Sequence, residues 1–422
     1  MMMFRRKKAR PHIPIPRRNN HNHIPEDIVF DVLSRLPVKS LLRFSCVCKS
    51  WSSLIHSRSF ISTHLNMSSC RVDNDHDHGY VMHMPRSSVE NTQLCTVTCD
   101  RTFDCISEFR APFIRYTYVV GSCNGLLCLY YYWNFNYNVH FWNPSIRKFK
   151  SLPTASIILS NTLSLGFAYD SQNNDYKLVK VEWPIEPSPT LLPLPPPEFE
   201  VYSLSSDSWR KVEFGISWRP NIWYYSINYD SPFPFVSGHL HFMVGTIRET
   251  GQQEMHPCEM ILSFDVNSEK IGELPVPDDD SFQGDSSYGK RLTLFKGKLA
   301  LIKEHSFRLC GYGHSVWVMM DYGACKSWNK LFSVTIEGPN VSGYTRFNGF
   351  TKYGSLLIQQ RLELIYNGKF IVENKFILFD PKTLHHKDIS IQFKYPSNLV
   401  SLYVVTYLES LALHDAENVV SY

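Results

Sequence analysis

IPEDIVFDVLSRLPVKSLLRFSCVCKSWSSLIHSRSFISTHL, residues Ile24 to Leu65, decides how the N-terminal part of this chain folds. Pro25 suits a first helical position, and Glu26 and Asp27 place carboxylates on the first turn, where the helix dipole favours negative charge. Apolar residues then recur at helical spacing until Pro37, which cannot continue a helix. The stretch therefore predicts a first helix that begins at Pro25 or Glu26 and ends before Pro37.

A second helix is expected after Pro37, because Ser40 can cap its N-terminus. Its apolar residues cover more than one face, namely Leu41, Leu42, Phe44, Val47, Cys48 and Trp51. A further short helix is expected after a turn at Ser57–Ser59. About forty residues are marginal as an independent domain, so helices with apolar faces this wide are expected to dock on other surfaces.

The same stretch resembles the F-box, and the alternative is an ordinary helical N-terminal subdomain. The resemblance lies in IPEDI, LSRLP, SLLRF, VCK and Trp51, in the right order and at fixed spacing. In that family the helices pack on a Skp1-type adaptor, which is bound to a cullin. The resemblance implies a Skp1-like adaptor as a partner, and cullin-1 through that adaptor. The implied adaptor-binding residues are Ile24, Pro25, Ile28, Leu33, Leu36, Ser40, Leu41, Val47, Cys48 and Trp51.

The remainder of the 422 residues has a β-rich composition, with 27 Phe, 23 Tyr and 9 Trp against a charged fraction of 19%. No apolar run has membrane-spanning length, and the N-terminus lacks the apolar core of a signal peptide. The 11 cysteines are odd in number and form no C-x-x-C pair, which is typical of reduced thiols. We therefore expect a cytoplasmic or nuclear protein, or one in both compartments, that contacts no membrane.

The net charge of +4 arises in the N-terminal tail. Seven Lys and Arg residues precede Glu26, and without them 36 positive charges would face 39 negative ones, a balance of −3. Because the basic residues are confined to the tail, no nucleic-acid partner is expected for the body of the protein. The cluster RRKKAR at residues 5–10 is either a nuclear-import signal or, in the preferred interpretation, part of a disordered basic tail over residues 1–22.

From Gly121 onward the chain contains an irregular repeat of strand, turn and strand. The equivalent turn positions are separated by 60, 62, 57 and 58 residues, and they are Asn143, Ser203, Asp265, Tyr322 and Asp380. Each period also has room for two earlier strands, which gives the four antiparallel strands of a propeller blade. Strand-like pieces at 78–84, 93–98 and 103–109 could belong to an incomplete first unit. The run 400–413 is expected to close the ring by pairing with N-terminal strands.

The repeat region is similar to the F-box-associated domain of plant F-box/kelch-repeat proteins, through Gly121–Cys128, Trp142–Ser145, Leu165–Asp170 and Tyr176–Lys180. The implied fold is mainly β. A small α-helical F-box at residues 23–65 precedes a kelch-like β-propeller of about six blades at 66–413 and a C-terminal tail at 414–422. Within this group the chain resembles both the S-locus F-box proteins of pollen and relatives that restrain defence responses.

The two resemblances imply a substrate-recognition subunit of an SCF (Skp1–cullin–F-box) ubiquitin ligase, which recruits target proteins for ubiquitination and proteasomal degradation without catalysis of its own. Nucleophile, zinc-hydrolase and nucleotide-binding strings are absent. Val72–His78 resembles a metal site but has no second group of ligands, so no metal or cofactor is expected. The alternative is a carbohydrate- or small-molecule-binding, or enzymatic, propeller with a vestigial F-box.

An unknown target protein is expected to contact loops, because loops on a rigid scaffold carry specificity and aromatic residues dominate binding hot spots. The Pro-rich stretch Pro184–Pro197 is one candidate loop, and polyproline recognition by another domain is its alternative role. An aromatic loop and an acidic loop are the others, although the aromatic residues could equally form strand core. The predicted target-binding residues are Trp223, Tyr224, Tyr225, Asp278, Asp279 and Asp280.

Overall fold

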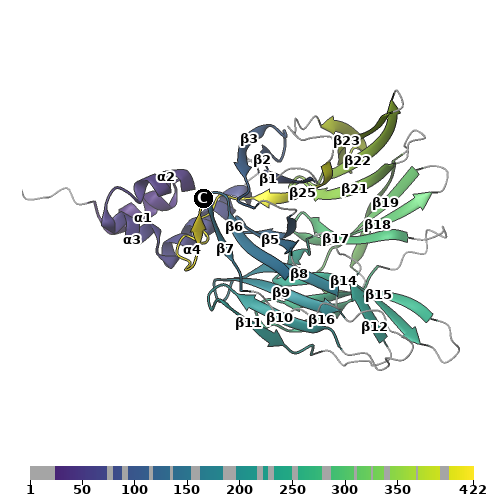
Figure 1. Ribbon diagram of the computed structural model, residues 1–422, viewed down its shortest axis with the longest axis horizontal. Helices are drawn as coiled ribbons and strands as arrows, with labels where there is room; N and C mark the ends of the chain where they lie inside the picture. Colours follow the sequence, from purple (N-terminus) through teal and green to yellow (C-terminus); the bar gives the residue numbers. More distant parts are fainter. Residues whose placement is uncertain are drawn as a thin grey trace, which may run out of the picture.

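Four helices at the N-terminal end lead into a ring of six β-sheets (Figure 1). The computed structural model describes residues 24–422 except 74–78, 88–93, 114–116, 134–135, 154–161, 184–195, 216–221, 227–231, 250–254, 278–286, 308–310, 325–326, 337–342, 367–368 and 390–398. The predicted basic tail, the acidic loop at 278–285 and most of the Pro-rich stretch lie outside the described residues.

The helices are α1 (Glu26–Ser34), α2 (Val38–Phe44), α3 (Lys49–Ile55) and α4 (Arg58–Asp73). Helix α1 starts directly after Pro25 and ends before Pro37, as predicted. The second predicted helix is wrong in two respects: α2 begins after Pro37 and not at Ser40, and it is separate from α3. The break lies at Cys48, whose backbone is extended, with φ −155° and ψ 162°. Helix α4 passes the predicted domain boundary at residue 65, so the two domains share it.

Each sheet is an antiparallel blade, and neighbouring blades contact one another around the ring through their inner strands. From the axis outward, blade 1 contains β25 (Leu399–Tyr407), β1 (Tyr80–Ser87), β2 (Leu94–Cys99) and β3 (Cys105–Arg110). Blade 2 contains β4 (Tyr118–Cys123), β5 (Leu126–Trp133), β6 (Asn136–Asn143), β7 (Lys148–Ser151) and β26 (Val420–Ser421). Blade 3 contains β8 (Thr162–Asp170), β9 (Asp175–Trp183), β10 (Glu198–Ser203) and β11 (Ser208–Val212).

In blade 4 the innermost position is divided between two short strands, which pair with different parts of β14. Blade 4 contains β12 (Ile222–Ser226) with β13 (Phe235–Val236), β14 (His239–Glu249), β15 (Met255–Asp265) and β16 (Ile271–Leu274). Blade 5 contains β17 (Ser287–Phe295), β18 (Lys298–Phe307), β19 (Gly311–Met319) and β20 (Trp328–Ile336). Blade 6 contains β21 (Gly343–Phe350), β22 (Leu356–Tyr366), β23 (Lys369–Asp380) and β24 (His385–Ile389). The prediction of about six blades is confirmed.

The ring is closed by the C-terminal part of the chain. Strand β25 is the innermost strand of blade 1 and pairs with β1, with Met82 opposite Val405. The predicted closure by the run 400–413 is therefore confirmed. The segment expected to be a tail, 414–422, also returns to the ring, because β26 pairs with β7 and the Trp142 indole donates a hydrogen bond to the Tyr422 hydroxyl at 2.8 Å. Both ends of the repeat region are thus held by non-local pairing.

Position within a blade decides how far a strand is buried. Every residue of β9 is buried, whereas most of β3 and β24 is exposed, because inner strands have neighbouring blades on both faces. The buried Lys177 Nζ lies 2.6 Å from Asp170 in its own blade and 2.8 Å from Glu269 in blade 4. Buried charges require partners of this kind. The ion pairs therefore link blades 3 and 4 as well as neutralising Lys177.

Four of the five predicted turn positions are the last residue of the third strand of their blade, and Tyr322 lies in the turn between the third and fourth strands. Asp265 Oδ1 accepts a hydrogen bond from the amide of Asn267 at 2.9 Å, and Asp380 Oδ1 accepts one from Lys382 at 2.9 Å, so these carboxylates build the turns. The sixth equivalent, Asp100 in blade 1, was missed. Asp100 precedes Asn143 by only 43 residues, because the connections in blade 2 are short. This spacing is shorter than that between the other turn positions, so the repeat pattern did not reveal Asp100.

Candidate functional site

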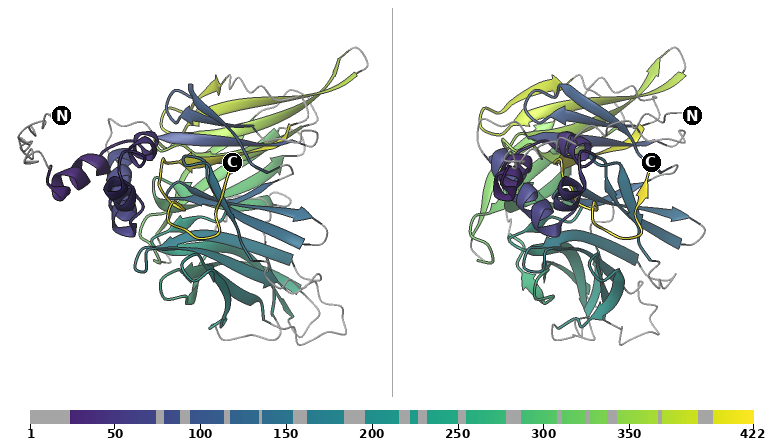
Figure 2. Two further views of the ribbon diagram at one scale, coloured as in Figure 1. Left: turned by 60° about the vertical axis from the view of Figure 1, so that its left-hand side comes forward. Right: turned by 90° about the vertical axis from the view of Figure 1, so that its left-hand side faces the viewer.

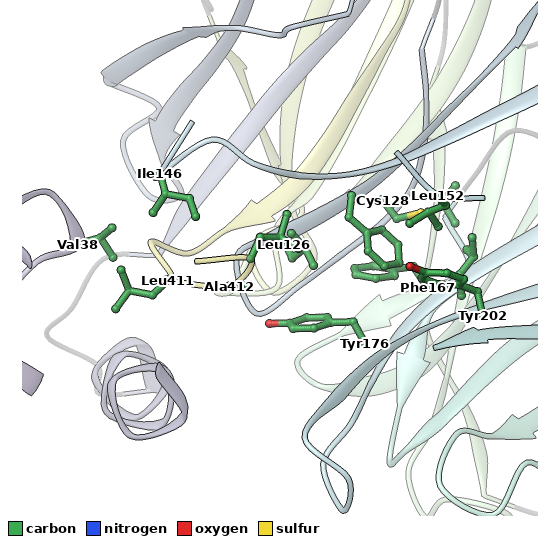
Figure 3. Close-up of a cluster of buried hydrophobic side chains, with 14 of the residues drawn as sticks. Val38, Leu126, Cys128, Ile146, Leu152, Phe167, Tyr176, Tyr202, Leu411 and Ala412 are labelled. Carbon is green, nitrogen blue, oxygen red and sulfur yellow. The ribbon is translucent and has the colours of Figure 1, made fainter. Parts of the chain in front are cut away.

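The helices α1 to α4 and the propeller share one hydrophobic core. Val38, Leu41 and Phe60 are buried in the same cluster as blade residues such as Leu126 and Phe167. Figure 3 shows Val38 beside Leu411 and Ile146, with Ala412 and Leu126 next along the cluster. The segment after β25 thus forms an apolar bridge between the helices and blade 2.

Polar contacts surround this bridge. The rings of His56 and His414 stack with centroids 3.9 Å apart, and Asn174 Nδ2 donates a hydrogen bond to Ser62 Oγ at 2.8 Å. Burial lowers the pKa of His414 to about 4, with the nearby positive groups acting in the same direction, so its ring is neutral at pH 7. A continuous apolar core with polar contacts at its edge fixes the helices in one orientation on the ring.

An exposed apolar surface remains on the helical region. We call it the apolar face, and its members are Ile24 (57% exposed), Ile28 (50%), Val32 (52%), Phe44 (36%) and Val47 (61%). Ile28 and Val32 are four residues apart in α1 and therefore lie on one side of that helix. The Phe44 ring contacts Trp51 edge to face at 5.8 Å. Exposed apolar residues gathered on one small unit are typical of a protein-binding surface.

The structure separates the ten predicted adaptor-binding residues into three groups. Ile24, Pro25, Ile28, Val47 and Cys48 are exposed, and Leu36, Ser40 and Trp51 are half-buried. Leu33 and Leu41 are 2% and 0% exposed, so they stabilise the helical core and offer no surface to a partner, which corrects the prediction for these two. Val32 and Phe44 were missed as surface residues. The spacing of Val32 from Ile28 already indicated its position.

The two rims of the propeller differ in their connections. Because the strands of a blade alternate in direction, the turns after its first and third strands lie on one rim and its other connections lie on the opposite rim. Ser62 contacts Asn174 in the turn after β8, and Val38 lies beside Ile146 in the turn after β6, so the helices occupy the first rim. Figure 2 shows the helices gathered at this end of the ring. We call the opposite rim the far rim.

The predicted target-binding residues belong to this far rim as far as they are described. Trp223, Tyr224 and Tyr225 lie in β12, paired with Ile247, Thr246 and Gly245 in the half of β14 that reaches the far rim. The prediction of a loop there is wrong, since these residues form a strand. Asp278, Asp279 and Asp280 lie outside the described residues, and the strands that flank them, β16 and β17, meet the far rim. The ends of β9 and β10 that flank the Pro-rich stretch also lie at the far rim.

The described part of the chain contains several buried histidines. No group of three or more His, Cys, Asp or Glu residues there could hold a metal ion. His241 Nε2 lies 2.8 Å from the Tyr322 hydroxyl, and burial lowers the pKa of His241 to about 4. Its other ring nitrogen faces the Pro234 carbonyl at 3.1 Å, so the ring packs between neighbouring blades. Across the described helices, none combines the length and the apolar composition that a membrane span needs.

Comparison with known proteins gives two family matches. Residues 22–63 match the F-box domain, and residues 65–413 match the F-box associated beta propeller domain. F-box protein CPR1 of Arabidopsis thaliana is 31% identical over 326 residues, which cover 74% of this chain and 73% of that protein. F-box protein At3g07870 of the same plant is 27% identical over 87% of both chains. F-box/kelch-repeat protein At3g23880, also from Arabidopsis thaliana, is 25% identical over 77% of this chain and 82% of its own length.

Proposed function

The chain belongs to the F-box proteins that carry an F-box associated β-propeller domain, and from this premise we propose that it is the substrate-recognition subunit of a Skp1–cullin–F-box ubiquitin ligase. The apolar face binds a Skp1-like adaptor, which connects the chain to cullin-1. The far rim binds the target protein, which is ubiquitinated and degraded by the proteasome. The chain itself is a non-catalytic receptor of the cytoplasm, the nucleus or both.

The observation that carries this proposal is the apolar face, which remains exposed although other residues of the helices are buried in a core shared with the propeller. The central residues of the face have large apolar side chains, which provide most of the affinity at protein interfaces. Ubiquitin transfer requires that the target be held close to the charged conjugating enzyme. A shared core between the helices and the ring supports this role, because it fixes the far rim relative to the adaptor.

The experiment that tests the proposal is reconstitution with purified partners. The full chain is co-expressed with a Skp1-like adaptor and combined with a cullin–RING module and a conjugating enzyme. We expect a stoichiometric complex, and ubiquitination of a bound target that requires this chain. If the chain stays free of the adaptor but binds glycans or small molecules tightly, it is a binding propeller with a vestigial F-box and the proposal is wrong.

Target recognition is tested separately by exchange of the far-rim segments. Proximity labelling in native tissue compares the wild-type chain with a chimera in which 184–197, 223–229 and 278–285 come from a close relative. Because the described strands that flank these segments end at the far rim, adaptor binding should be unchanged while the labelled proteins change. An unchanged set of labelled proteins would place recognition elsewhere and leave the ligase assignment intact.

A further inference from the structure

A cavity of about 400 Å³ lies on the axis of the ring, and this volume is typical of small-molecule sites. The innermost strands of all six blades contribute to its lining. Residues of the turns on the helix-bearing rim, such as Asn124 and Thr351, also line it. The cavity is therefore separate from the apolar face, and it is displaced from the far rim.

The walls of the cavity are mainly apolar and aromatic, and two arginines stand among them. Phe233 and Phe347 are buried wall residues, whereas Arg291 in β17 and Arg346 in β21 are half-buried. Arg291 Nη1 donates a hydrogen bond to the carbonyl oxygen of Phe347, the residue after Arg346. The two arginines therefore come from neighbouring blades, and the Arg291 guanidinium reaches the strand that carries Arg346.

Arg346 stacks on an aromatic ring. The Arg346 guanidinium carbon lies 5.7 Å from the centroid of the Tyr403 ring in β25. Stacking on an aromatic face leaves the edge of a guanidinium group directed at other partners, and that edge matches a carboxylate in geometry. Blades 5, 6 and 1 thus jointly orient the basic groups at the cavity.

The balance of charge in the cavity favours an anion. The described lining contains one acidic residue, Asp100, and two basic residues, Arg291 and Arg346. Burial raises the pKa of Asp100, although the Lys352 amide donates a hydrogen bond to its Oδ2 at 2.6 Å. Glu304 also interacts with both arginines, and burial raises its pKa as well. Glu304 is not part of the lining, so the described lining has two guanidinium groups against one carboxylate.

We propose that the axial cavity binds a small carboxylic acid with an aromatic or aliphatic body. The carboxylate contacts Arg346 and Arg291, and the body packs on Phe233 and Phe347. Such a ligand would contact several blades at once and would stabilise the closed ring by binding the folded state alone. This inference is independent of the proposed ligase function, because it concerns the propeller without adaptor or target.

The test is calorimetric titration of the full chain with three probes, phenylacetate, 3-phenylpropionate and octanoate. We expect at least one of these acids to bind at one site per chain and to raise the melting temperature. Phenylacetamide has the same ring without the charge, and sulfate has charge without an apolar body. Both should bind at least about tenfold more weakly than the best acid, since each lacks one half of the recognised chemistry.

Variants locate the site. Arg346→Gln and Arg291→Gln should each weaken the best acid by about tenfold or more. Arg101→Gln is the matched control, because Arg101 also stacks on a tyrosine, Tyr353, at 5.9 Å but is exposed and does not line the cavity. If none of the three acids binds at millimolar concentration, or if the amide or sulfate binds as well as the acids, the proposal is overturned. Equal effects of Arg101→Gln and the cavity variants would overturn it too.

Discussion

The side-chain amide of Asn143 donates a hydrogen bond to the carbonyl oxygen of Ala412 at 2.8 Å. The same nitrogen lies 3.0 Å from the carbonyl oxygen of Ser410, and Asn143 is completely buried. The turn between β6 and β7 therefore holds the segment that packs against Val38 of the F-box through Leu411. A residue of the sequence WNPS in blade 2 thus supports the attachment of the F-box.

Asn143→Ala should lower the free energy of unfolding by about 2 to 4 kcal/mol, because two buried carbonyl oxygens lose their donor. Chemical denaturation measures this loss. Asn329→Ala is the control, since Asn329 is exposed in β20, the outer strand of blade 5. The control should change stability by less than about 0.5 kcal/mol. Equal losses in the two variants would contradict a special role for the buried amide.

Gly125 and Gly297 give a second test of the same attachment. Both follow a residue with positive φ in a tight hairpin turn, and their own φ values are 77° and 75°. A Cβ at Gly125 would lie 2.3 Å from the Leu408 carbonyl oxygen, whereas nothing lies within 4 Å of one at Gly297. Gly297→Ala should therefore cost about 1 kcal/mol of backbone strain.

Gly125→Ala should cost several kcal/mol more than Gly297→Ala, because the segment at Leu408 would have to move away from blade 2. Paired urea unfolding curves measure the difference. Limited proteolysis should also cut the F-box from the ring faster in the Gly125 variant. Similar unfolding midpoints for the two variants would show that the segment does not press against Gly125 in solution.

Local sequence signals predicted much of this architecture. Pro25 and Pro37 set the bounds of α1, and the spaced turn residues marked five of the six blades, because both depend on near neighbours in the chain. The split between α2 and α3 was not predictable in this way. The apolar residues around Cys48 fit one continuous helix as well as two, and only the packing of the helices on one another decides between these.

The candidate sites depend on non-local geometry. Leu33 and Val32 are adjacent apolar residues in α1, yet one is 2% exposed and the other 52%, since α4 packs against one side of the helix. Arg291 and Arg346 are 55 residues apart in the sequence. They line the same cavity only because β17 and β21 occupy the innermost positions of neighbouring blades, so no sequence motif marked the axial cavity.

Stability should fall in mild acid because of buried histidines. Burial lowers the pKa of His83, His140, His241 and His414 to about 4, while an unfolded chain has histidine pKa values of about 6.5. Between pH 6.5 and 4 the unfolded state therefore binds protons that the folded state does not. The free energy of unfolding is fully retained above about pH 6.5 and decreases as the pH falls towards 4.

Denaturation curves at several pH values measure this decrease, which should be on the order of 1 kcal/mol per buried histidine for each pH unit. His83→Gln should flatten the slope, because Gln keeps a polar partner for Thr98, which lies 2.8 Å from His83 Nε2, and does not titrate. His385→Gln is the control, since His385 is exposed in β24. A slope that His83→Gln leaves unchanged would show that this histidine is not buried as a neutral group.

The measurement that tests the central claim most directly is the affinity of the full chain for a purified Skp1-like adaptor, with Val47→Asp compared with Ile106→Asp. Both side chains are exposed, 61% and 56%, but Val47 belongs to the apolar face and Ile106 to the outer strand of blade 1. An unpaired carboxylate buried in the interface costs about 3 kcal/mol or more. Val47→Asp should therefore reduce the affinity at least about a hundredfold, with an unchanged melting temperature, while Ile106→Asp binds like the wild type. Wild-type affinity of the Val47→Asp chain would contradict the assignment of this face as the adaptor-binding site.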